Sequence, residues 1–227
     1  MAMRSHSKRK ILAALSVAVC LLILKVTVSV VSNYVDYLPP NFESDFLLGR
    51  DAYFFGAYQW AFYTHIASGP LTLIFGIFLL SDRLRNRFPR WHRYIGRGQV
   101  NLVLFMVTPS GIWMSMYAAT GLVAGTGFAV LAVATGITAG CGWRTAVRRK
   151  FAEHRRWMTR CYILLCSAVV LRLTVGLFIV TKIDGDWISP MTAWTSWLVP
   201  LLIYELLAAK KNHRTVGPSQ GRSATSA

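Results

Sequence analysis

Three ionisable side chains lie within long apolar stretches of the sequence, where a charged group is unexpected: His65, Arg172 and Glu205. A fourth, Lys25, is expected to extend its side chain outward to the membrane surface. If these stretches cross a lipid bilayer, each charge costs about 2.5 to 3.5 kcal/mol on insertion scales, so it normally faces a partner or a cavity. A histidine exchanges protons near neutral pH, whereas an arginine keeps its charge and suits an anion. His65 and Arg172 therefore indicate a site for a proton, an anion or a larger ligand.

Small residues follow His65 along one face of its predicted helix. Gly69, Thr72 and Gly76 lie four, seven and eleven positions later, and this spacing places them beneath the imidazole. The groove suits a flat ligand, for which Gly69 and Thr72 are the expected contacts, or simply another helix. A neutral histidine hydrogen-bonded to a neighbouring helix is the alternative without a ligand.

Arg172 is expected at a depth that overlaps that of His65. It lies roughly 12 Å from the end of its predicted helix near Thr181, at 1.5 Å per residue. Its partner would be an anionic ligand, a carboxylate or a set of freed helix carbonyls, and the last of these would make its role structural. Glu205 is expected near the opposite end of its own helix, too far away to pair with Arg172.

Two further histidines, His92 and His154, each stand in a segment with an adjacent arginine and a tryptophan, just before a predicted helix. Such segments anchor helices at a membrane surface and bind lipid phosphate. The alternative is that His92 and His154 are the opposed ligands of a haem b iron, with nearby arginines pairing the propionates. If the helix runs unbroken from His154, Arg172 lies on the same face, eighteen residues on.

The composition predicts an all-α membrane bundle to carry these residues. Hydrophobic residues make up 54% of the 227 positions, charged residues 15%, and the mean hydropathy is +0.43. A helix needs about 20 apolar residues to cross the hydrocarbon core. Six stretches meet this length: residues 11–31, 57–80, 98–119, 122–142, 161–181 and 190–209.

The basic residues predict the orientation of these six transmembrane helices. Lys and Arg number 25 against 9 acids, and 21 of the 25 fall before the first stretch, in the second and fourth connections, or in the tail. By the positive-inside rule both termini are cytoplasmic. The net charge of +16 is therefore a topology signal that also attracts anionic lipid headgroups, and it does not indicate a nucleic-acid partner.

The chain divides into three parts on this interpretation. Residues 1–10 form a basic cytoplasmic N-terminus, residues 11–209 form the transmembrane domain, and residues 210–227 form a disordered cytoplasmic tail. The outer loop 32–56 is rich in aromatic residues and predicts a lid or a short interfacial helix. In the fourth stretch Ala132, Gly136 and Gly140 recur every fourth residue, which favours close packing of a neighbouring helix.

Three ordered strings give the chain a family resemblance: His65-Ile66-Ala67-Ser68-Gly69-Pro70, His92-Arg93-Tyr94-Ile95-Gly96-Arg97 and His154-Arg155-Arg156-Trp157-Met158-Thr159-Arg160. Over roughly residues 50–209 the chain resembles the domain-of-unknown-function family 2306 of predicted membrane proteins. The resemblance implies a multi-pass protein of a bacterial cytoplasmic membrane and carries no established activity.

A looser similarity is to the two-haem ascorbate-reducing cytochromes b, six-helix proteins in which pairs of histidines hold the haems. The chain departs from that pattern because residues 122–142 contain no histidine, so at most one bis-histidine site is left.

The leading hypothesis is a membrane-embedded ligand-binding or redox protein. His65 and Arg172 would line one site, and His92 and His154 another, with electrons passing to or from a quinone or a small reductant if haem binds. The alternatives are a small transporter or proton-coupled carrier that uses His65 and Arg172, and a lipid-organising or assembly protein without catalysis. Whether the protein is an enzyme stays open.

Overall fold

Regular secondary structure is helical throughout the part of the chain that the computed structural model describes, residues 2–44 and 46–216, with side chains at positions 10–11, 13–44 and 46–210. This agrees with the all-α class expected from the apolar stretches. The elements in chain order are α1 (Ala2–Ser32), η1 (Asn33–Tyr37), α2 (Asp51–Phe54), α3 (Ala57–Leu80), α4 (Asp82–Arg87), α5 (Pro89–Leu102), η2 (Val103–Val107), α6 (Thr108–Ser115), α7 (Leu122–Val147), α8 (Phe151–Leu165), α9 (Ser167–Thr181) and α10 (Ile188–Val216).

Five helical stretches of the described chain are long and apolar enough to cross a membrane: Ala13–Tyr37, Ala57–Leu80, Leu122–Val147, Phe151–Thr181 and Ile188–Lys210. The expected third span, residues 98–119, is not one regular α-helix. It is built from the end of α5, the π-helical η2 and the short α6, which ends at Ser115. Pro109 explains part of this irregularity, because a proline offers no N–H to the preceding turn. The π-helical hydrogen bonds lie just ahead of it, where Thr108 N bonds to Val103 O.

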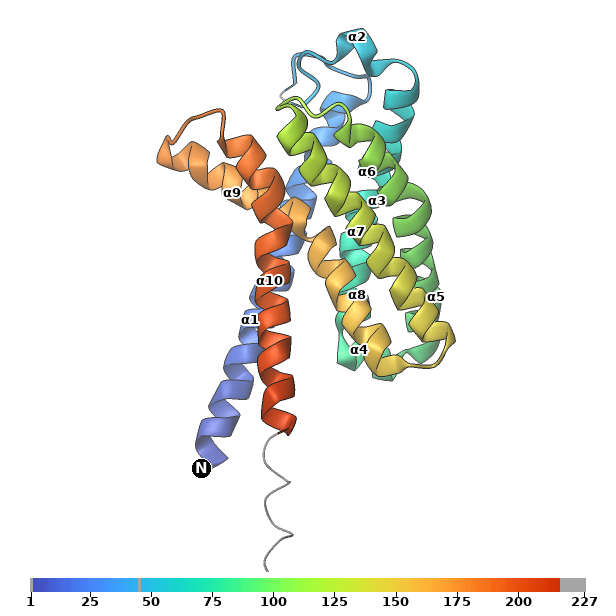
Figure 1. The fold of residues 1–227 in the computed structure, drawn as a ribbon, viewed down its shortest axis with the longest axis vertical. Helices are drawn as coiled ribbons and strands as arrows, with labels where there is room; N and C mark the ends of the chain where they lie inside the picture. Colours follow the sequence, from blue (N-terminus) through green and yellow to red (C-terminus); the bar gives the residue numbers. More distant parts are fainter. Residues whose placement is uncertain (1, 45, 217–227) are drawn as a thin grey trace, which may run out of the picture.

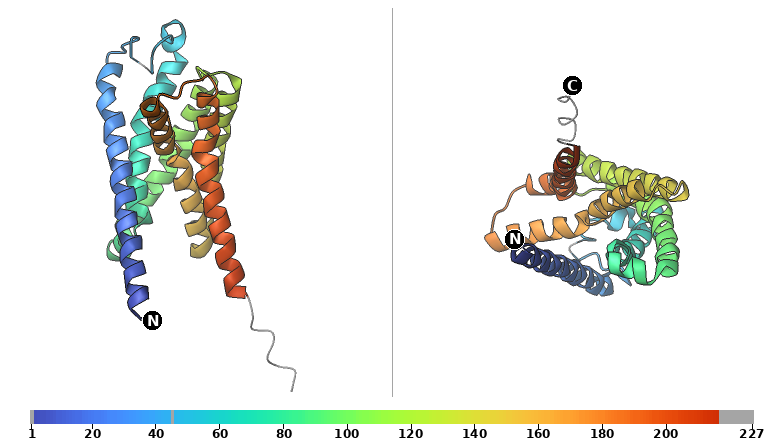
Figure 2. Two further views of the ribbon diagram at one scale, coloured as in Figure 1. Left: turned by 90° about the vertical axis from the view of Figure 1, so that its left-hand side faces the viewer. Right: turned by 90° about the horizontal axis from the view of Figure 1, so that it is seen from below.

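The long helices lie roughly side by side (Figure 1). The helices α3, α5, α7 and α8 form one group, α10 packs on α7 and α8, and α1 contacts α3 and α9. The start of α1 and the end of α10 point to the same end of the molecule as α4 and the turn between α7 and α8 (Figures 1 and 2). We call this the basic end, because it carries the arginines of residues 83–97 and 144–160. The segment 33–56 folds over the other end, which we call the cap end.

Small residues allow the helices of the core to approach closely. A Cβ added at Gly76 of α3 would lie 1.9 Å from the Tyr162 ring of α8, and one at Gly142 of α7 would lie 2.5 Å from Met158 Sδ. The predicted small-residue stripe is partly used. Gly136 lies against Thr108 of α6, whereas no heavy atom lies within 4 Å of a Cβ built at Gly140.

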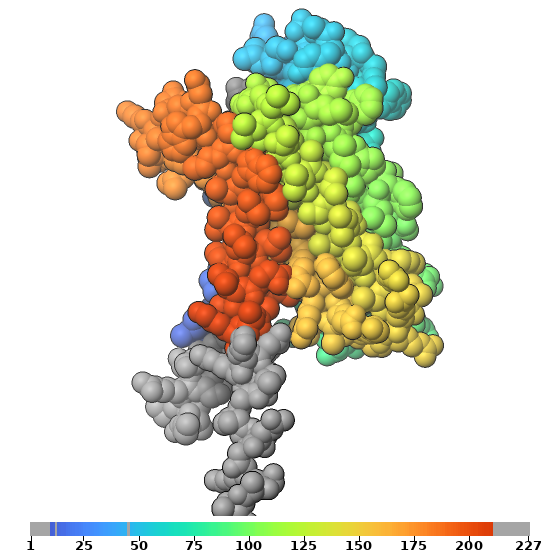
Figure 3. All heavy atoms as spheres, in the orientation of Figure 1, coloured from blue at the N-terminus to red at the C-terminus, as the bar shows by residue number. Residues whose placement is uncertain are grey.

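The condition of an unbroken helix from His154, on which the shared face of His154 and Arg172 depended, is not met. The helix is interrupted at Cys166, where α8 ends and α9 begins. The axis then changes direction, so that α9 leaves the group of packed helices and, with the loop after it, projects from the body of the molecule (Figures 1 and 3). The side chain of Tyr162 holds the end of α8 on α3 by donating a hydrogen bond of 3.0 Å to Leu73 O. No proline or glycine stands at this bend, and the structure gives no further cause for it.

Candidate functional site

The imidazole of His65 points from α3 toward α6. Its Nδ1 lies 3.0 Å from Ser110 Oγ, and Ser110 Oγ lies 2.5 Å from Met106 O. A serine hydroxyl has one hydrogen, which the carbonyl takes, so His65 Nδ1 is the donor to Ser110. The neutral ring therefore keeps a lone pair on Nε2. The ring also hydrogen-bonds to the backbone of Val107, the residue three positions before Ser110.

A second polar contact lies one residue along α3 and comes from the first helix. Pro70 has no N–H to offer the carbonyl of Ile66, four residues earlier. Tyr34 fills the gap, because its hydroxyl donates to Ile66 O at 2.5 Å. The carbonyl freed by the proline thus binds a tyrosine of η1, the short helix that continues α1, one residue from His65.

Arg172 extends from α9 toward the same region. Its guanidinium interacts electrostatically with Tyr34, Tyr37 and His65. The only hydrogen bond recorded for it in the described chain is from Nη1 to Ala168 O of its own helix, at 3.1 Å. We call Tyr34, His65, Ser110 and Arg172 the intramembrane polar cluster. Its residues come from η1, α3, α6 and α9, and within it His65 and Arg172 are close enough to interact electrostatically.

No carboxylate in the described chain forms an ion pair with Arg172. Glu205 is occupied at the basic half of α10. Its two oxygens accept from Arg160 Nε at 2.6 Å and from Nη2 at 2.9 Å. The guanidinium of Arg160 also lies 4.9 Å from the Trp157 ring centre. Glu205 is therefore a structural partner that joins α8 to α10, and Arg172 keeps donors without a carboxylate partner among the described residues.

The groove beneath His65 is only partly open. No heavy atom lies within 4 Å of a Cβ built at Gly69, whereas the Tyr162 ring covers Gly76. Thr72 is fully buried; its hydroxyl donates to Gly69 O and its carbonyl accepts from Gln99 Nε2. Of the expected ligand contacts, Gly69 thus borders open space and Thr72 is engaged in joining α3 to α5.

His92 and His154 approach each other at the basic end, closely enough to interact electrostatically. His154 Nδ1 lies 2.8 Å from Gly142 O, and His92 Nδ1 is buried without a partner. Burial, with the nearby Arg85 and His154, lowers the pKa of His92. Beside them, hydrogen bonding from Arg155 and the charge of Arg85 hold the pKa of the Asp82 carboxyl below its usual value.

Metal ligation at these histidines is not decided by this arrangement. The described residues contain no group of three or more His, Cys, Asp or Glu side chains able to hold a metal ion. A bis-histidine haem needs only two imidazoles, so this finding does not address it. Haem binding at His92 and His154 stays a prediction from the sequence.

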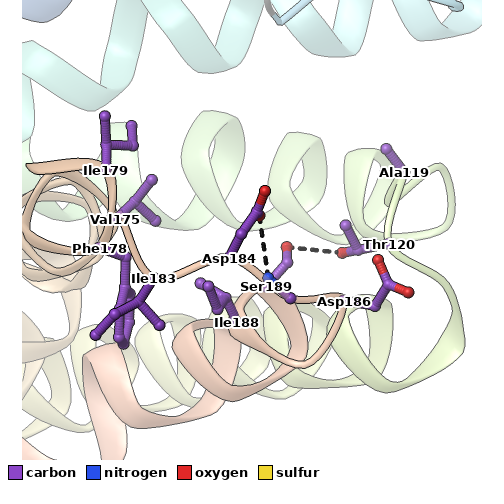
Figure 4. Close-up of a pocket in the computed structure, with 11 residues that line it drawn as sticks. Ala119, Thr120, Val175, Phe178, Ile179, Ile183, Asp184, Asp186, Ile188 and Ser189 are labelled. Carbon is purple, nitrogen blue, oxygen red and sulfur yellow. Dashed lines mark hydrogen bonds between the residues drawn. The ribbon is translucent and has the colours of Figure 1, made fainter. Parts of the chain in front are cut away.

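A pocket that the sequence did not indicate opens at the cap end, between the end of α9 and the start of α10. Its volume is about 530 Å³, and Val175, Phe178 and Ile183 form an apolar wall opposite Asp184 and Asp186 (Figure 4). On its floor Ser189 Oγ donates to Thr120 Oγ1 at 3.0 Å. Its two carboxylates are exposed, so the pocket could accept a cation but offers nothing to an anion.

Tyr34 of the intramembrane polar cluster and Arg50, a buried structural residue of the segment 33–56, are two residues that sequence reasoning missed. The signal for Tyr34 was indirect. Pro70 indicates that the carbonyl of Ile66 lacks its helical donor, but it does not indicate which residue replaces that donor. Arg50 donates to two local partners, Phe46 O and Tyr53 Oη, and to Tyr117 O, which is 67 residues away. The contact with Tyr117 leaves no local pattern in the sequence.

The apolar spans and the buried polar contacts between them define an all-helical membrane protein. Its family follows from comparison: the chain matches the family described as predicted membrane protein (DUF2306) over residues 62–208 and belongs to that family. No curated protein and no solved structure matches the chain.

Proposed function

We propose that the protein binds a lipid-soluble carboxylate at the intramembrane polar cluster. The observation that carries this proposal is the guanidinium of Arg172, which lies in a membrane-spanning segment with one bond to its own helix and no carboxylate partner among the described residues. A charge at that depth normally has a counterion. A guanidinium and a carboxylate pair through two parallel hydrogen bonds, which matches the donors that Arg172 retains.

His65 would supply the second contact. Its imidazole interacts electrostatically with Arg172, so it would lie beside the carboxylate that Arg172 binds. Gly69, which borders open space, leaves room beside the ring. Thr72 is left out of the proposed site because its polar groups are already paired.

The proposed topology places this site in the outer half of a bacterial cytoplasmic membrane. The chain crosses six times, with residues 98–115 as the irregular third span, and both termini are cytoplasmic with the basic end. The charge asymmetry supports this orientation. Reporter fusions after Phe88 and after Lys210 should report the same side, and a fusion at Gly185 the other; a different pattern would overturn it.

Thermal unfolding of the full-length protein in nonionic detergent tests the carboxylate site. Oleate is expected to raise the melting temperature, whereas oleyl alcohol, which has the same chain and no charge, should not. Arg172→Gln should abolish the oleate shift and His65→Gln should reduce it. Lys182→Gln, which removes an exposed charge just beyond α9, should keep the full shift.

The outcomes separate the alternatives. If wild-type protein shows no oleate shift, or if Arg172→Gln keeps it, the carboxylate site is wrong. If Lys182→Gln loses the shift as fully as Arg172→Gln, the effect comes from general surface charge and the proposal also fails.

A further inference from the structure

The first turns of α5 present two different faces. Gln99 and the Nδ1 atom of His92 are buried on the side that meets the other helices. Arg90, Arg93 and Arg97 lie at i, i+3 and i+7, so their side chains share the opposite side of the helix. All three are exposed, as is Tyr94 beside them.

These four outward residues enclose a shallow pocket of about 270 Å³. None of the three arginines takes part in an ion pair within the described chain, although other arginines at this end do: Arg85 and Arg155 pair with Asp82, and Arg160 pairs with Glu205. The pocket therefore collects three uncompensated guanidinium groups. The positive end of the α5 dipole adds to their field, because Arg90 and Arg93 lie in its first turns.

The surroundings of this pocket belong to a membrane surface. At the start of α5, Trp91 is 62% exposed and Phe88 is 42% exposed. In η2, which continues α5, Phe105 is 73% exposed. Exposed aromatic residues next to arginines are typical of the headgroup level of a bilayer. An exposed phenylalanine nearer the middle of the span, such as Phe105, is typical of contact with lipid acyl chains. A ligand with an anionic head and apolar tails would meet matching groups at both heights.

We propose that Arg90, Arg93, Tyr94 and Arg97 form a binding site for the phosphate headgroup of an anionic phospholipid. Guanidinium groups bind phosphate oxygens in pairs, and the Tyr94 hydroxyl adds a further donor. The site is separate from the intramembrane polar cluster, since it lies on the outward face of α5 at the basic end. It therefore does not depend on the function proposed for Arg172.

Native mass spectrometry of the full-length protein in nonionic detergent tests this site with dioleoyl phosphatidylglycerol as the probe. Wild-type protein should retain this lipid in preference to dioleoyl phosphatidylcholine. The variant Arg90→Gln/Arg93→Gln/Arg97→Gln should bind phosphatidylglycerol at least about tenfold more weakly. The matched control is Arg83→Gln/Arg148→Gln/Arg156→Gln, which removes three exposed charges from the same end outside the pocket, and it should bind as the wild type does.

Equal weakening in the two triple variants would overturn the proposal, because it would show attraction by general charge. So would equal retention of phosphatidylcholine. Displacement of the lipid by glycerol phosphate at similar concentration would mean that the pocket serves a soluble phosphate. The single variant Arg93→Gln, expected to weaken binding about threefold, gives the same decision if the triple variant does not fold.

Discussion

Arg50 and Arg172 carry the same side chain in two regions of the molecule, and the protein treats them oppositely. Arg50 is 8% exposed in the cap, where it donates to Phe46 O, Tyr53 Oη and Tyr117 O and lies 4.8 Å from the Phe46 ring centre. Arg172 is largely exposed and donates to one carbonyl of its own helix. The guanidinium of Arg50 is used in hydrogen bonds within the fold, whereas that of Arg172 keeps most of its donors unpaired among the described residues. The comparison teaches that pairing, more than residue type or charge, separates a structural arginine from a candidate binding residue.

The largest effect is expected from Arg50→Ala. The change leaves two carbonyls without their donor and removes the bridge between the cap and Tyr117, so the free energy of unfolding should fall by about 3 kcal/mol. Denaturant titration in detergent, followed by tryptophan fluorescence, measures it. Arg50→Lys should fall between the variant and the wild type, because an ammonium cannot reproduce the fork. A loss below about 1 kcal/mol would remove the contrast on which the comparison rests.

Arg172→Gln should change the stability of the ligand-free protein by less than about 1 kcal/mol, because an exposed side chain with a single bond to its own helix contributes little. The same titration measures this, with Arg50→Ala beside it as the reference for a structural arginine. A loss as large as that of Arg50→Ala would show that Arg172 also serves the fold, and the two regions would no longer differ.

His92 is half-buried, between the buried Arg50 and the exposed Arg172. Its substitution should give the smallest effect of the three. Its pKa is lowered in the folded protein, chiefly by burial, so the unfolded chain binds the proton more readily. Stability is then fully present above the unfolded-state pKa of about 6.5 and falls as the pH drops below it. Melting temperatures at about pH 8 and about pH 5.5 should therefore differ less in His92→Gln than in the wild type. An identical pH dependence in both proteins would contradict this reading of the basic end.

The sequence predicted the helical class, because apolar length follows from local residue types. The shared site of His65 and Arg172 stays a prediction, with their electrostatic interaction as its support. The sequence did not predict the bend at Cys166, since that residue stands among apolar neighbours without a proline or glycine. Pro109 marked an irregular third span but not its π-helical form. The role of Arg50 depends on partners in different elements, and contacts of that kind leave no trace in spacing along the chain.

The hydrogen bond from Tyr34 to the Ile66 carbonyl has a consequence for other members of the family. The family match starts at Phe62, so the helix that carries Tyr34 lies outside the shared region while the proline that requires its hydroxyl lies inside. A relative without a counterpart of that helix would have to satisfy the same carbonyl with another donor, such as a second subunit, a water or a lipid hydroxyl. In this chain Tyr34 supplies that donor from within the same polypeptide.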